Sequence, residues 1–282
     1  MASVAVLPEV REEEASPEVA AIYAGLREAV GVPIVNLIWR HFATLPGVLP
    51  WTWEAARGAI GSATVAEGAE RMAALVRAAP SLDLSAVGPA FRALPAEERA
   101  RVADVVRIYN RGNSVNLQVL SAVRRCVSSG APTGGAPPRA GGAALAPVAA
   151  SIPPLPRMAD LPGAARAEVA ALAALHDPSD PVVPSLYRHL ALWPGILPPL
   201  REDLAPRFGE GRIVSLRASL LGVAEESAAA LLPRLAPPGP FPAEHRGAVL
   251  RVLAVFPGKL IAEMAGVGLA LDAELSRAGA PR

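Results

Sequence analysis

The hydrophobic pattern along this chain lacks the strict alternation that β-strands require. Alanine and leucine dominate the apolar positions, and period-two runs of valine, isoleucine, threonine and aromatic residues are nearly absent. Alanine and leucine favour helices, whereas alternating β-branched and aromatic residues are typical of strands. The pattern therefore predicts an all-α protein.

Helix-start signals divide the first half into segments. Ser16 followed by Pro17 predicts a helix start, with a capping side chain and then proline at the first helical position. Residues 64–67 (TVAE) read as a capping box before an apolar-periodic run. Pro95 and the acidic residues after it predict a long helix that ends near Val127.

A stretch rich in Gly, Pro and Ala, residues 129–150, interrupts the helical pattern. Such a composition cannot hold a long helix and is typical of a linker. It divides the chain into a first helical repeat at 1–128 and a second at 151–282.

The two halves carry a gap-free internal match. Residues 33–50 (PIVNLIWRHFATLPGVLP) align with residues 181–198 (PVVPSLYRHLALWPGILP), and Pro, Arg-His, Ala, Pro-Gly and Leu-Pro coincide. A match that mixes such special residues indicates duplication. In the first copy we expect a helix over 35–44, a turn at Pro46 and Gly47, and a second helix over 51–59. Two such halves predict a pseudo-symmetric pair of repeats around a shared central cavity.

Composition narrows the function classes. Of 282 residues, 52% are apolar and 19% charged, with a formal net charge of +1, so a packed core is expected and no basic block suggests nucleic-acid binding. Cys126 is the single cysteine and the four histidines lack metal-ligand spacing, so we expect no disulfide and no metal. Without a signal-peptide pattern or an uninterrupted apolar span, we expect a cytoplasmic protein with no membrane role. A homodimer is compatible with the size, but no heptad pattern specifies one.

Three segments resemble the group I 2-haloacid dehalogenases, which act on both D and L substrates (halocarboxylic acid dehalogenases). They are the run from Val32 to Pro50, the segment Tyr-Asn-Arg-Gly-Asn at 109–113, and Leu-Ala-Leu-Trp-Pro at 190–194. The resemblance covers nearly the whole chain. It implies two pseudo-symmetric helical repeats with the active site between them. It also implies hydrolysis of short 2-halo carboxylic acids without a cofactor, by direct attack of water on Cα.

The resemblance also assigns site positions. Asn113 matches the family's catalytic asparagine, while the catalytic aspartate falls on Leu186. The substrate-binding positions fall on Ser185, Ile34, Leu37 and Phe256.

Leu186 cannot accept a proton, which leaves two hypotheses open. Asp177 or Asp180, in a loop slightly longer than the family's, could replace the missing acid, although aspartate beside proline more often forms a turn. The chain is then a dehalogenase-like hydrolase. Alternatively it is a non-catalytic protein that binds a small carboxylic acid or apolar ligand in a more apolar pocket.

Several polar residues also have structural interpretations. Asn113 could pair with Asn110 one helical turn away instead of facing a ligand, and Ser185 could cap a helix. The recurring pairs Arg40-His41 and Arg188-His189 could bind a carboxylate, but satisfying helix-end carbonyls near the Pro-Gly turn is favoured. Residues 12–14 (EEE) are interpreted as a solvated charge run.

Overall fold

The computed structural model describes residues 7–79, 82–129, 145–179 and 182–279. All regular structure within those ranges is helical and none is a strand, which confirms the predicted all-α fold. The α-helices are α1 (Pro17–Val30), α2 (Leu37–Phe42), α3 (Val48–Ile60), α4 (Ala63–Ala78), α5 (Val87–Arg92), α6 (Ala96–Ser129), α7 (Gly163–His176), α8 (Ser185–Leu190), α9 (Leu197–Gly209), α10 (Arg212–Leu231), α11 (Arg246–Val255) and α12 (Ala262–Gly279).

Most helix starts follow the signals in the sequence, with one correction. The Ser16 hydroxyl accepts the Val19 N–H at 3.4 Å at the start of α1, and α6 covers the long helix predicted after Pro95. The predicted capping box at 64–67 is wrong, because α4 begins at Ala63 with Ser62 at its N-cap. The cap therefore lies two residues earlier, and the glutamate of the box is already inside the helix.

The helices of the repeated segment are placed differently from the prediction. The first is shorter, because α2 spans only Leu37–Phe42 of the expected 35–44. The second is longer, because α3 starts at Val48, directly after Gly47, whose φ of 75° turns the chain. In the other half, α8 has the same six-residue length as α2.

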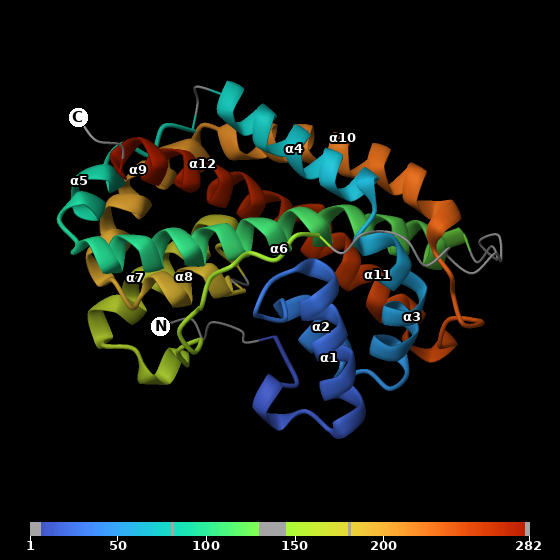
Figure 1. The fold of residues 1–282 in the computed structure, drawn as a ribbon. Helices are drawn as coiled ribbons and strands as arrows, with labels where there is room; N and C mark the ends of the chain where they lie inside the picture. The colour runs from blue at the N-terminus through green and yellow to red at the C-terminus, as the bar shows by residue number, and fades with distance from the viewer. Residues whose placement is uncertain (1–6, 80–81, 130–144, 180–181, 280–282) are drawn as a thin grey trace.

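The 34-residue helix α6 lies at the centre of the fold (Figure 1). It packs against α3 and α4 from the same half of the chain and against α10 and α12 from the other half. Both halves therefore share one core around α6. The proposed boundaries at 128 and 151 and the two-fold relation remain predictions, and most of the expected linker, 130–144, lies outside the described residues.

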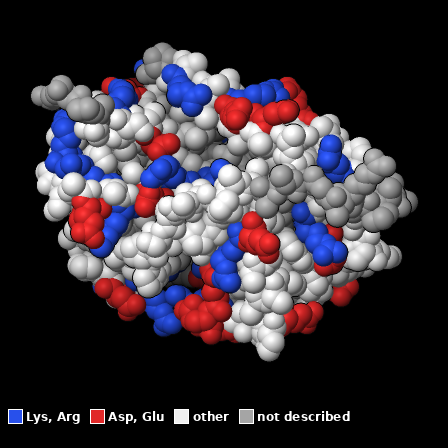
Figure 2. Space-filling model, in the orientation of Figure 1, with Lys and Arg blue, Asp and Glu red and all other residues white. Residues whose placement is uncertain are grey.

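A continuous helical stretch near the C-terminus is the one described segment apolar and long enough to cross a membrane, Ala243–Gly279. Of its most apolar window, 67% is buried inside the protein, as expected for a core helix. On the face seen in Figure 2, acidic and basic side chains are interspersed rather than gathered into a basic patch.

The first Arg-His pair anchors the segment that precedes α1. Arg40 Nε forms an ion pair with Glu9 at 3.0 Å, and both side chains are about nine-tenths buried. His41 Nδ1 lies 2.8 Å from the Pro8 carbonyl oxygen. The expected contact with helix-end carbonyls is therefore wrong for Arg40, whose partner is a carboxylate.

The second pair anchors the corresponding segment before α7. Arg188 donates to the Pro156 carbonyl through two nitrogens, at 3.0 and 2.7 Å, and His189 Nε2 lies 2.9 Å from the Pro153 carbonyl. Arg188 does bind a carbonyl, but one upstream of its helix rather than at the Pro-Gly turn. Each pair thus holds an extended segment against a six-residue helix.

Candidate functional site

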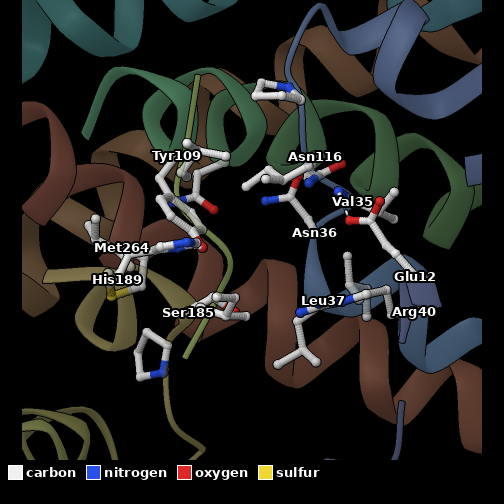
Figure 3. A pocket seen from close by; sticks show the side chains of 18 of the residues that line it. Glu12, Val35, Asn36, Leu37, Arg40, Tyr109, Asn116, Ser185, His189 and Met264 are labelled. Carbon is white, nitrogen blue, oxygen red and sulfur yellow. Dashed lines mark hydrogen bonds between the residues drawn. The ribbon is translucent and has the colours of Figure 1, made fainter. Parts of the chain in front are cut away.

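A cavity of about 400 Å³ lies between the two halves. Its walls come from the start of α2, the middle of α6, the extended segment 152–155, the start of α8 and the first turn of α12. Figure 3 shows Tyr109, His189 and Ser185 on one side of this space and Asn36, Asn116 and Leu37 on the other. The volume is in the range of small-molecule sites, about 300–1,000 Å³.

The cavity brings together the residues that the resemblance singled out. Asn113 and Leu186, the two positions assigned to catalysis, both line it. The assigned substrate-binding residues line the same space: Ser185, Ile34, Leu37 and Phe256. Residues more than 200 positions apart in the chain therefore line the same cavity.

Of the two candidate replacement acids, the one that the structure describes does not line the cavity. Asp177 is not among the cavity-lining residues. It pairs with Lys259 at 3.0 Å and accepts hydrogen bonds from Ser179 N–H and Oγ, which is the alternative turn chemistry. Asp180 lies outside the described residues.

Helix α6 presents one polar stripe to the cavity. Tyr109, Asn113 and Asn116 are spaced by four and three residues, so they share a helical face, and all three line the site. Sequence reasoning selected only Asn113. The i, i+4, i+7 spacing of polar residues inside a largely buried helix was the signal for the other two.

The asparagines of α6 have separate roles. Asn110 donates to the Gly268 carbonyl at 3.0 Å and therefore ties α6 to α12, so the suggested pairing with Asn113 is wrong. Asn116 is 1% exposed; its Oδ1 accepts the Trp39 indole N–H at 2.8 Å, while its Nδ2 is buried without a partner. A buried amide donor without a partner is costly, so the Asn116 amide points to a ligand acceptor at this wall.

Most of the remaining wall is apolar. Leu186 is 1% exposed and lies in the first turn of α8. Phe256 opens a π-helical turn, η7 (Phe256–Ile261), between α11 and α12. Pro257 follows it and lacks the N–H that a regular α-helix would use, which accounts for the break. The wide turn sets the Phe256 ring against the cavity.

The charged groups at the mouth are held in pairs. Glu12, in the 3₁₀ turn η1 (Glu12–Glu14), accepts the Val35 N–H at 3.0 Å and forms an ion pair with Arg27. Glu13 pairs with Arg11 at 2.6 Å. The interpretation of 12–14 as a purely solvated run is therefore wrong for Glu12, which fixes the loop before α2.

Tyr109 and His189 form a hydrogen-bonded pair in the wall, with 2.7 Å between Tyr109 Oη and His189 Nδ1. The pKa of His189 is lowered to about 4: burial is the largest cause, Arg188 and Arg40 act in the same direction, and the hydrogen bond to the Pro153 carbonyl opposes them. Burial also raises the pKa of Tyr109. Both groups are therefore uncharged at neutral pH. Sequence reasoning treated His189 only as part of the repeated Arg-His pair, with a carboxylate or helix-end carbonyls as the expected partners.

Ser185 has no capping role. It is the first residue of α8, Pro184 is the N-cap, and no side-chain cap bond forms. Its Oγ lies near the Tyr109 hydroxyl but is buried without a hydrogen bond of ordinary geometry. The Ser185 hydroxyl is thus available to a bound ligand.

Replacing Ser185 by alanine is expected to separate stability from binding. Because the Ser185 hydroxyl makes no hydrogen bond of ordinary geometry in the folded protein, Ser185→Ala should change the free energy of unfolding by less than about 0.5 kcal/mol. Affinity for a ligand that bonds the hydroxyl should fall by about 0.5–1.5 kcal/mol. Urea denaturation and calorimetric titration measure the two. A stability loss with unchanged affinity would contradict the assignment.

Comparison with known proteins finds solved structures of the same architecture. A D-2-haloacid dehalogenase mutant superposes with a TM-score of 0.76 and 17% identity, over 96% of each chain. A D-2-haloacid dehalogenase complex with L-LA superposes with a TM-score of 0.74 and 18% identity, over 97% of each chain. A D-2-haloacid dehalogenase mutant in complex with D-2-CPA superposes with a TM-score of 0.71 and 17% identity, over 97% of this chain and 96% of that one. No family model matches, and a search of curated proteins finds no match.

The chain has the fold of the 2-haloacid dehalogenases. The superposition extends over essentially the full length of both chains, which confirms at the level of the fold the resemblance carried by the repeated segment and the α6 motif. The identity of 17–18% places this sequence as a divergent representative of that fold.

Proposed function

We propose that this protein is a cofactor-independent hydrolase that attacks Cα of a short 2-halo carboxylic acid with water. The observation that carries the proposal is the convergence of Asn113 and the four substrate-binding positions, Ser185 among them, on one cavity within a dehalogenase fold. Hydrogen-bond donors and acceptors line the cavity on the sides formed by α6 and α8. Apolar side chains surround the rest, as a small acid with an alkyl or halogen group requires.

The polar residues have distinct tasks in this proposal. The amides of Asn113 and Asn116 donate to the substrate carboxylate or hold the attacking water. Ile34, Leu37 and Phe256 contact the carbon chain and exclude bulk solvent. Exclusion of water strengthens each of these hydrogen bonds.

The test is halide release from D- and L-2-chloropropionate by purified protein, measured against a no-enzyme control. Asn113→Ala should lower turnover about 10²-fold or more if its amide positions the reacting water. Asn110→Ala is the matched control, since Asn110 lies on the same helix but bonds Gly268 instead of lining the cavity. Equal activity of the two variants would contradict the role of Asn113.

One observation favours the second candidate, a non-catalytic binding protein for a small apolar acid. Leu186 occupies the position of the expected base, and the carboxylates of Glu12 and Glu13 are held by arginines. A protein of this kind would bind 2-chloropropionate or a longer-chain acid, seen by calorimetry, and release no halide from either enantiomer.

A further inference from the structure

The proton positions of the Tyr109–His189 pair follow from their neighbours. His189 Nε2 lies 2.9 Å from the Pro153 carbonyl oxygen, which can only accept, so Nε2 carries the proton. The neutral ring then has an acceptor at Nδ1, and the Tyr109 hydroxyl donates to it. The lone pairs of Tyr109 Oη face the nearby Ser185 hydroxyl and a group bound inside the cavity that all three residues line.

His189 also has the proton affinity that a missing carboxylate would supply. Burial, with Arg188 and Arg40 nearby, lowers its pKa to about 4, which is close to the ordinary value of aspartate, about 3.9. His189 lies one turn after Leu186 on α8, and both line the cavity. His189 is therefore a proton acceptor with a pKa like that of aspartate, one helical turn from Leu186, where the family has its carboxylate.

Resting on the hydrolase proposed above, we propose that Tyr109 and His189 form the proton relay that activates the attacking water. As the water oxygen forms its bond to Cα, the Cα–halogen bond breaks and halide leaves with the electron pair. The water proton passes to Tyr109 Oη while the Tyr109 proton passes to His189 Nδ1. The imidazolium then returns its proton to solvent, which leaves a 2-hydroxy acid and the original pair.

The remainder of the site supports this assignment. Asn113 follows Tyr109 by one turn on the same face of α6, so a water bound to its amide is within the reach of Tyr109 Oη. The Pro153 carbonyl, bonded to Nε2, stabilises the imidazolium that forms. Figure 3 shows the Tyr109–His189 pair facing the cavity, with Asn36 and Asn116 across from it.

The chain offers matched controls for both members of the relay. Tyr109→Phe removes the hydroxyl, and His189→Gln keeps hydrogen-bonding groups but removes the basic nitrogen. Tyr23→Phe and His41→Gln are the controls. Tyr23 donates to the Val10 carbonyl at 2.8 Å, His41 bonds the Pro8 carbonyl at 2.8 Å, and neither lines the cavity.

We expect Tyr109→Phe and His189→Gln to lower kcat for halide release about 10²-fold or more, with little change in KM. Tyr23→Phe and His41→Gln should stay within about threefold of the wild type. Absence of halide release by the wild type would overturn the hydrolase and the relay together. Release by the wild type that survives in both relay variants would overturn the relay alone.

The pH profile and nuclear magnetic resonance give readouts that a structural role would not move. The relay requires neutral His189, so kcat should fall as pH drops through about 4, and the His189→Gln variant should lack this limb. The charged or titratable groups around the ring are Tyr109, Arg188 and Arg40. Arg11, Glu12 and Glu13 lie elsewhere on the cavity wall. ¹⁵N spectra of wild-type protein at pH 7 should show Nε2 protonated and Nδ1 bare. The opposite tautomer would overturn the relay whether or not turnover is observed.

Discussion

Placing an aspartate at position 186 of the His189→Gln variant is expected to raise halide release about 10²–10⁴-fold above that of His189→Gln alone. Leu186 already faces the cavity from the first turn of α8, so the new carboxylate would enter the site without movement of the backbone. It would restore the general base from the same helix that His189 occupies. Steady-state halide release with both enantiomers of 2-chloropropionate measures the gain.

The matched control is Leu186→Asn in the same His189→Gln background. Asparagine has nearly the shape and polarity of aspartate but cannot take up the water proton. Activity should therefore return with aspartate and not with asparagine. Equal recovery would show that polarity or added space at position 186, rather than basicity, limits the reaction.

The pH dependence of the rescued enzyme follows from burial. Leu186 is 1% exposed, so an aspartate there should have its pKa raised above about 3.9 by desolvation. The carboxylate is the active form, so activity should be complete above the raised pKa and lost as pH falls through it. The same burial should lower the free energy of unfolding by about 1–3 kcal/mol, which urea denaturation of the single variant Leu186→Asp can measure.

Helix type and order could be read from the sequence because local residues decide them. Ser16 begins α1 through its own hydroxyl, and the long run after Pro95 needs only its helical periodicity. Boundaries were less certain where two caps compete. Ser62 is two residues before the predicted Thr64 cap. Helix α4 has Ser62 as its N-cap, although the Ser62 side chain makes no capping hydrogen bond.

The cavity residues were predictable by resemblance, but their partners were not. Asn110 and Asn113 differ by one helical turn, and only the packing of α12 against α6 makes the first a tie to Gly268 and leaves the second in the cavity. Arg40 and Arg188 occupy the same place in the repeat, yet one binds a carboxylate and the other a carbonyl. Such choices depend on segments far away in the chain.

The tautomer of His189 is the clearest property that sequence could not supply. It depends on Pro153, which is 36 residues upstream, and on Tyr109 from the other half of the chain. Its pKa depends on burial and on Arg40 from α2. The tautomer and the pKa of this histidine are therefore set only when the two halves pack together.

A second buried network lies behind the cavity wall. His176, the last residue of α7, bonds Glu263 through Nδ1 at 2.8 Å and the Tyr187 hydroxyl through Nε2 at 2.9 Å. Arg217 from α10 pairs with the other oxygen of Glu263. Because Tyr187 follows Leu186 and Glu263 precedes Met264, this network fixes two stretches that line the cavity.

Replacing Glu263 by alanine is expected to lower the free energy of unfolding by about 3–5 kcal/mol, because its partners would be left in a buried site without the carboxylate. The side chains of His176 and Glu263 are each 2% exposed, so solvent cannot replace the lost bonds. Glu225→Ala is the matched control. Glu225 likewise has two basic partners, Arg124 and Arg125, but its side chain is 30% exposed, and its loss should cost about 1 kcal/mol or less. Urea denaturation compares the two variants. Equal losses would mean that the buried carboxylate contributes no more than a surface ion pair, and that packing of α8 against α6 and α7 holds this part of the cavity wall without it.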